Sequence, residues 1–151
     1  MDLQEYTEPR RLEYYSFVWS EARLVIAAVA LLIGGRPVLS AILPHPAFSA
    51  LVGAVLTITW ILSGVASGYL LYRWVQAGQE VFGGKDIRDT AAFLIAAVSG
   101  INLGLVGLIG TNIGMTILSN YPVFVIVALL YIAAALYLFQ RWSASGKKLF
   151  R

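Results

Sequence analysis

Three polar residues inside apolar stretches are the candidates for chemistry in this chain. Glu21 and Arg23 interrupt the first apolar stretch, and Asn102 interrupts the third. Charged and strongly polar side chains are costly to place in a membrane, so they commonly mark a substrate, proton or ion path. Two positions apart on a helix, Glu21 and Arg23 point in nearly opposite directions and do not form a pair within that helix. The three residues therefore suggest a polar path near the first and third stretches.

Each of the three residues also has a purely structural interpretation. Arg23 could extend its stem to the headgroups of the nearer membrane surface, with Glu21 beside it at the same interface. Asn102 could hydrogen-bond a neighbouring helix, which is a common role for an asparagine in a membrane span. The sequence leaves both interpretations open.

The sequence contains no motif that would indicate catalysis or a cofactor. The chain has no cysteine, which removes thiol catalysis, disulfides and thiolate metal sites. His45 is the only histidine, and a single histidine without a carboxylate cluster makes neither a metal site nor a haem site. No Ser/His/Asp set or phosphate-binding glycine loop is present. We therefore expect no enzymatic activity, no metal and no cofactor.

Composition indicates which elements must position the polar residues. The 151-residue chain is 59% hydrophobic and 13% charged, whereas soluble domains are roughly 25% charged. Residues 47–75 and 91–118 each exceed the roughly 20 apolar residues that cross about 30 Å of hydrocarbon. Residues 17–33 and 123–139 are shorter apolar stretches. The sequence predicts an all-α integral membrane protein with four transmembrane helices in a single membrane domain, residues 1–151.

The second half of the chain repeats features of the first. At one constant offset in residue number, Leu32-Ile33-Gly34, Pro46 and Phe48 recur as Leu108-Ile109-Gly110, Pro122 and Phe124. At a second, shorter offset, Arg73-Trp74, Gly78 and Phe82 recur as Arg141-Trp142, Gly146 and Phe150. Apolar letters can match by chance, but glycine and proline have backbone constraints that a random apolar stretch does not repeat in order.

The repeated pattern predicts a tandem duplication of a helical hairpin, with residues 10–83 and 86–151 as the two copies. Two spans in each copy give both copies the same orientation in the membrane. A parallel pseudo-two-fold axis would then run along the membrane normal.

The distribution of basic residues predicts the orientation. Of eleven Lys and Arg residues, only Arg36 lies on one side; the other side holds Arg10, Arg11, Arg23, Arg73, Lys85, Arg88, Arg141, Lys147, Lys148 and Arg151. The positive-inside rule then predicts an inner-membrane protein with both termini cytoplasmic. Its basic side would contact anionic lipid headgroups, and we expect no nucleic-acid partner.

The two outward connections contain apolar segments, residues 37–43 and 113–118. Each could be the last turns of a long helix, a helix at the membrane interface or a short re-entrant segment. A re-entrant segment must be shielded by protein or line water, which would imply a functional cavity.

Small residues and Arg-Trp pairs predict how the helices are held. Glycines spaced for helix packing are Gly64 and Gly68 in the second span, then Gly100, Gly104, Gly110 and Gly114. Such residues let helix backbones approach closely, within the chain or between chains. Arg73-Trp74 and Arg141-Trp142 would anchor the cytoplasmic ends of spans two and four at the headgroups.

Two classes of function fit these features. The first is a small transporter or channel-like oligomer with Glu21, Arg23 and Asn102 along its path. The second is a non-catalytic scaffold or accessory subunit, whose glycine-rich faces bind a second copy or another membrane protein. A water-accessible cavity that reaches Glu21 would favour transport, and an exposed glycine face would favour the scaffold.

Overall fold

The computed structural model describes residues 8–117 and 119–150. Leu118, in the second outward connection, and Arg151, in the basic tail, lie outside the described residues. Seven helical elements follow one another: α2 (Pro9–Leu32), α3 (Val38–Ile42), η1 (Pro46–Phe48), α4 (Ser49–Gln76), α5 (Ile87–Ile109), α6 (Ile113–Ile117) and α7 (Tyr121–Ala144). Apart from an isolated β-bridge between Val81 and Gly84, the regular structure of these residues is helical.

Four of the helices are long and apolar enough to cross a membrane: α2, α4 with η1, α5 and α7. Helix α4 has 28 residues, α5 has 23, and α2 and α7 have 24 each. At about 1.5 Å per residue, even the shortest helix spans roughly 35 Å. The prediction of an all-helical chain with four such helices is confirmed.

Local sequence accounts for the helix ends. Pro9 occupies the first turn of α2, where its missing N–H costs nothing. The Asp86 carboxylate accepts from the amides of Arg88 and Asp89 and caps α5. At the other end of α5, Gly110 has φ of 70° and stops the helix.

The two connections predicted to face outward contain separate short helices. A turn at Gly34 and Gly35 separates α2 from α3, and Gly110 separates α5 from α6. The interpretation of residues 37–43 and 113–118 as the last turns of long helices is therefore wrong. The same break corrects the packing role predicted for Gly110 and Gly114, because α5 ends before both of them.

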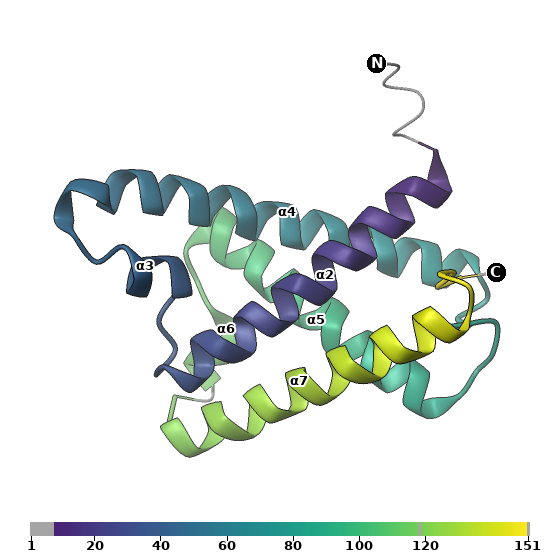
Figure 1. The fold of residues 1–151 in the computed structure, drawn as a ribbon. Coiled ribbons are helices and arrows are strands. Elements are labelled where there is room, and N and C mark those ends of the chain that lie inside the picture. The colour runs from purple at the N-terminus through teal and green to yellow at the C-terminus, as the bar shows by residue number, and fades with distance from the viewer. Residues whose placement is uncertain (1–7, 118, 151) are drawn as a thin grey trace.

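The bundle has two unlike ends (Figure 1). At one end, which we call the basic end, α2 and α5 begin and α4 and α7 finish. At the opposite end, which we call the loop end, α3 and α6 follow the last turns of α2 and α5. The most extensive packing joins α4 to α5, followed by α2 to α7.

Glycines make the α4–α5 contact close. A Cβ atom built on Gly104 would lie 2.6 Å from the Gly64 Cα atom, and one built on Gly107 would lie 2.8 Å from an Ile61 side-chain carbon. Gly100 faces Ser67 in the same interface, whereas a Cβ on Gly68 would make an ordinary contact with Ile101. Three of the predicted glycines, Gly64, Gly100 and Gly104, thus serve packing within the chain.

Candidate functional site

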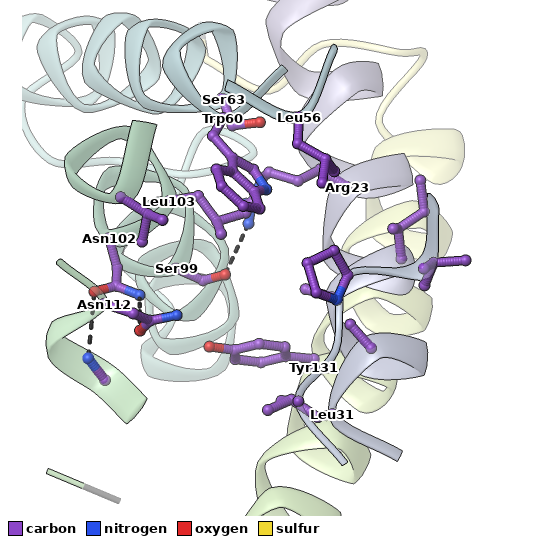
Figure 2. A pocket seen from close by; sticks show the side chains of 18 of the residues that line it. Arg23, Leu31, Leu56, Trp60, Ser63, Ser99, Asn102, Leu103, Asn112 and Tyr131 are labelled. Atoms are coloured by element: carbon purple, nitrogen blue, oxygen red, sulfur yellow. Dashed lines mark hydrogen bonds between the residues drawn. The ribbon is translucent and has the colours of Figure 1, made fainter. Parts of the chain in front are cut away.

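A cavity of about 560 Å³ occupies the half of the bundle nearest the loop end. Its walls come from α2, α4, α5 and α7, and residues of both outward connections line it, including Gly35, Pro37 and Met115. Most of the wall is apolar, with side chains such as Ile26, Val55 and Val106. Polar residues gather along one part of the cavity, as Figure 2 shows.

Arg23 lies at the inner end of the cavity. Its side chain comes from the middle of α2, and the residue is only 6% exposed. The Nη1 atom donates to the Ser99 hydroxyl at 2.7 Å, and Nη2 donates to the Ser20 hydroxyl at 3.2 Å and the Ala96 carbonyl at 2.7 Å. The Nε atom is buried without a hydrogen-bond partner. These bonds hold the guanidinium inside the bundle, so the interpretation that Arg23 extends to the headgroups is wrong.

Asn102 joins α5 to the second outward connection. Its side-chain nitrogen donates to the Asn112 side-chain oxygen, Oδ1, at 3.0 Å, and its own Oδ1 atom accepts from the Gly114 backbone amide at 3.3 Å. Gly114 thus lies beside a residue seven positions before the end of α5, roughly 10 Å back along that helix axis. The α6 segment therefore folds back along α5, and Asn102 and Asn112 line the cavity.

Glu21 does not join this group. Arg23 and Asn102 line the cavity and Glu21 does not. One Glu21 carboxylate oxygen, Oε1, is buried with no hydrogen-bond partner among the described residues. The structure thus brings together two of the three predicted path residues.

Aromatic side chains form part of the cavity wall. Trp19, Trp60 and Tyr131 line it, and the Trp19 indole N–H donates to the Ser63 hydroxyl at 3.1 Å. Figure 2 shows the Trp60 ring among the cavity side chains together with Arg23, and the Tyr131 hydroxyl points toward the side of Ser99 and Asn112. Trp60 and Tyr131 were not singled out from the sequence, because isolated aromatic residues in an apolar stretch carry no positional signal.

Between Arg23 and the basic end, the bundle is densely packed. The buried cluster there includes Phe17, Leu70, Phe93, Leu138 and Trp142, which are each no more than 5% exposed. Phe17 is six residues before Arg23 on α2, about 9 Å closer to the basic end. The cavity is therefore blind, with its inner end near the middle of the helices.

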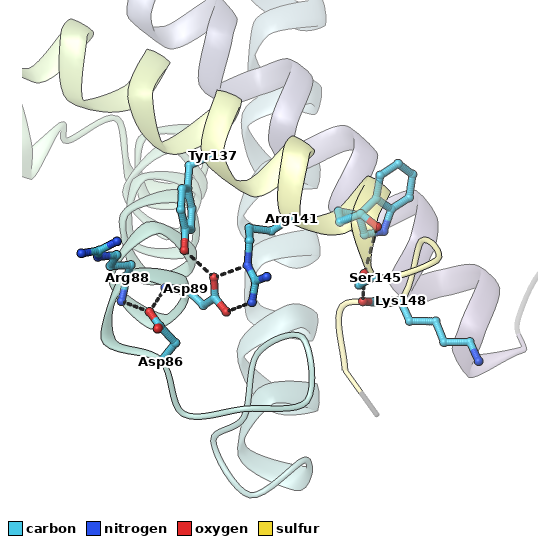
Figure 3. Close-up of polar contacts among 8 residues, drawn as sticks. Asp86, Arg88, Asp89, Tyr137, Arg141, Ser145 and Lys148 are labelled. Atoms are coloured by element: carbon cyan, nitrogen blue, oxygen red, sulfur yellow. Dashed lines mark hydrogen bonds and ion pairs between the residues drawn. The ribbon is translucent and has the colours of Figure 1, made fainter.

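Two ion pairs hold the basic end. Arg141 binds Asp89 through Nε at 2.8 Å and Nη2 at 2.6 Å, while the Tyr137 hydroxyl donates to the same carboxylate at 2.7 Å (Figure 3). Arg73 binds Glu13 at 3.2 Å, and the Glu13 carboxylate also accepts from the Phe150 amide. Sequence analysis missed both acids. The signal was present, because the offset from Glu13 to Asp89 equals the offset from Leu32 to Leu108 in the repeated pattern.

The Arg-Trp pairs are therefore not simple headgroup anchors. Trp142 is 5% exposed and packs against Phe17, with ring centroids 5.1 Å apart. Trp74 packs against Phe93 at 5.8 Å. Since each arginine binds an acid and each tryptophan packs on a phenylalanine, these residues join helices of the bundle. The anchoring role of Arg73, Trp74, Arg141 and Trp142 at the headgroups stays a prediction, to which the structure adds these contacts within the bundle.

The chain matches no family model, no curated protein and no solved structure. Its class is defined by the fold alone, as an all-helical chain with four helices that can span a membrane. Among the described residues, no group of three or more His, Cys, Asp or Glu side chains could hold a metal ion.

Proposed function

We propose that this chain is an integral membrane carrier that binds a small molecule in the blind cavity and alternates access to it between the two sides. The observation that supports this proposal is the position of the cavity. It begins at the outward connections and stops at Arg23 and Ser99, beside the packed cluster of the basic end. A carrier presents such a site near the middle of the membrane to one side at a time.

A scaffold that binds other helices through its glycine faces has less support. Gly64 and Gly104 contact each other inside the chain, so this face is not available to a partner. A homo-oligomer that uses other surfaces stays a prediction, which light scattering of the purified protein can test.

Thiol labelling tests the carrier proposal directly, because the chain has no cysteine to remove. Leu103 lines the cavity one turn from Ser99, so we expect Leu103→Cys to react with a membrane-impermeant thiol reagent added outside the cell. Alternating access also requires reaction in inside-out vesicles. Ala97→Cys is the matched control, because Ala97 is on the same helix but 1% exposed and outside the cavity lining. Reaction of Leu103→Cys from one side only, or from neither, would contradict a carrier.

Glu21 is not part of the proposed path. Because Glu21 does not line the cavity, Glu21→Gln should leave the two-sided labelling of Leu103→Cys unchanged. Loss of labelling from either side would return Glu21 to the transport mechanism.

The orientation proposed is inner-membrane, with both termini cytoplasmic and α3 and α6 facing outward. Support comes from the basic end, where Arg10, Arg11, Arg73, Lys147 and Lys148 line a second hollow beside the C-terminal segment. Anionic headgroups of the cytoplasmic leaflet would bind there. A reporter that is active only in the cytoplasm should be active when fused after Arg151 and inactive when inserted at His45.

We also propose that the chain arose by tandem duplication of a hairpin. Equivalent positions of the two halves make equivalent contacts. The ion pair Glu13–Arg73 corresponds to Asp89–Arg141, and the stacking of Phe17 on Trp142 corresponds to that of Phe93 on Trp74. Glu13 and Phe17 are related to Asp89 and Phe93 by the first offset of the repeated pattern. Arg73 and Trp74 are related to Arg141 and Trp142 by the second offset.

Backbone geometry after the second helix of each half supports the same proposal. Gly78 and Gly146 have φ of 68° and 69°, and the residues after them, Gln79 and Lys147, have φ of 64° and 62°. Two consecutive residues at positive φ are uncommon, particularly where the second is not glycine.

Arg23 and Ser99 occupy equivalent positions in the two proposed halves, and they hydrogen-bond to each other. A pseudo-two-fold axis between the halves would therefore pass beside these two residues. Exchanging these two residues tests the relation between the halves. Ser99→Arg alone would place two guanidinium groups together and should be strongly destabilising. The double variant Arg23→Ser, Ser99→Arg should recover most of the lost stability in a denaturation experiment. A double variant as unstable as Ser99→Arg would contradict the pseudo-two-fold relation.

A further inference from the structure

The chemistry of the cavity indicates the kind of molecule it accepts. Arg23 takes no part in the two ion pairs of the basic end, and no carboxylate among the described residues forms an ion pair with it. Glu21, two positions away on α2, interacts with Arg23 electrostatically but forms no ion pair with it. The hydrogen-bond acceptors of Arg23 are two hydroxyls and one carbonyl, all of them neutral. A buried cation without a direct counter-ion is costly, and a bound anion would compensate it.

Arg23 also retains hydrogen-bonding capacity. A guanidinium has five N–H donors, and the hydrogen bonds to Ser99, Ser20 and Ala96 use three of them. The Tyr131 hydroxyl, which points toward the side of Ser99 and Asn112, supplies a neutral donor in the wall of the same cavity. Charge-assisted hydrogen bonds from a guanidinium to a carboxylate or a phosphate are among the strongest in proteins.

The remainder of the cavity suits hydrocarbon. Val55, Leu56, Leu103, Val106 and Val127 are among its wall residues, and its volume of about 560 Å³ lies within the roughly 300–1,000 Å³ typical of small-molecule sites. A fully polar anion would leave these walls without apolar contacts. A neutral hydrocarbon would leave Arg23 uncompensated.

We propose that the cavity binds an amphipathic anion, with its carboxylate or phosphate at the Arg23 guanidinium and its hydrocarbon part against the apolar walls toward the loop end. This inference rests on the proposed function in that both use the same cavity. The shared chemistry, an anionic head on a hydrocarbon chain, can come from a free fatty-acid-like molecule or from an anionic membrane lipid.

Tryptophan quenching tests the proposal on the purified full-length protein in phosphatidylcholine nanodiscs. The probes are decanoate brominated next to its carboxylate, and the matching brominated decanol. Bromine quenches indole fluorescence at short range, and Trp19 and Trp60 line the same cavity as Arg23. We expect saturable quenching by the acid, about tenfold or more tighter than any quenching by the alcohol. Trp19→Phe and Trp60→Phe should each reduce the saturable signal, and the double variant should remove most of it.

Two variants assign the preference to Arg23. Arg23→Met keeps an apolar stem of similar length without the charge, and should reduce the preference for the acid over the alcohol to about one. Arg23→Lys keeps the charge and should retain part of that preference. If the variants do not fold, the wild-type comparison decides alone, because equal affinity for acid and alcohol, or no saturable quenching, would overturn the proposal.

Nanodiscs that contain phosphatidylglycerol distinguish the two sources of the anion. Loss of the acid's quenching through competition would assign the site to a membrane lipid, and unchanged quenching would assign it to a free amphiphile. The quenching is also independent of transport. Saturable binding together with one-sided labelling of Leu103→Cys would contradict the carrier and leave the anion site in place. Two-sided labelling without a preference for the acid would contradict the anion site and leave the carrier in place.

Discussion

Replacing Gly104 by alanine should separate the two most closely packed helices of the bundle. The added Cβ atom would lie 2.6 Å from the Gly64 Cα atom, while ordinary contacts begin at 3.4 Å, so the helices must part by about 0.8 Å. The obstacle is backbone, which cannot rotate away as a side chain can. Overpacking of this kind costs ~1–3 kcal/mol, and a gap of 0.5–1 Å also removes roughly a quarter to a half of each dispersion contact.

Gly53→Ala is the matched control. Gly53 is also within a long helix, α4, but a Cβ atom there would meet nothing within 4 Å. Both variants replace a helical glycine by alanine and gain the same helix propensity. This contribution of about 1 kcal/mol therefore largely cancels when their stabilities are compared. We expect Gly104→Ala to be less stable than Gly53→Ala by ~2–3 kcal/mol, which is about 30-fold to 140-fold in the folding equilibrium.

The assay is reversible unfolding in mixed micelles with increasing dodecyl sulfate, followed by far-ultraviolet circular dichroism. A cooperative transition allows the free energies of unfolding to be compared directly. Equal stability of Gly104→Ala and Gly53→Ala would refute the reasoning, because it would mean that α4 and α5 do not meet at these glycines.

The same titration tests the basic end. Asp89→Asn should destabilise the fold by ~1.5–3 kcal/mol, because a 1% exposed acceptor of three hydrogen bonds loses its charge, while Arg141, whose side chain is 45% exposed, can still reach water. Glu13→Gln should cost less, and an equal or larger loss would contradict the ranking. Phe150→Ala should cost ~3–5 kcal/mol, since Phe150 is 6% exposed. Phe139 is 56% exposed, so Phe139→Ala should cost much less, and similar losses would show that Phe150 is not buried.

Sequence patterns predicted features that depend on one helix or on neighbouring residues. Long apolar stretches predicted the four helices, and four-residue spacing predicted that Gly64 and Gly104 would serve packing. Asn102 bonds a neighbouring segment, as one of its two interpretations required, although the partner is the short connection rather than a long helix.

The errors concern residues whose partners lie far away in the chain. Arg23 was open to a headgroup role because nothing near it in sequence shows that Ser99 and the Ala96 carbonyl are within reach. The contact of Trp142 with Phe17 was missed for the same reason, since Phe17 is in the first helix. Extending the repeat would have exposed part of this information, because the offset from Arg23 to Ser99 is also that from Leu32 to Leu108.

The proposed duplication gives a physical reason why Arg23, at the centre of the bundle, has no ion-pair partner among the described residues. In a dimer of two identical hairpins, the residue next to the symmetry axis meets its own copy. Two guanidinium groups about 4 Å apart repel by ~4 kcal/mol at an effective dielectric constant of about 20, in addition to the cost of burying each. In a fused pair the second copy can carry a serine instead, and Ser99 accepts a hydrogen bond where a second arginine would have repelled. One cation without an ion-pair partner then lies beside the cavity, and this charge is what gives the proposed site its preference for an anion.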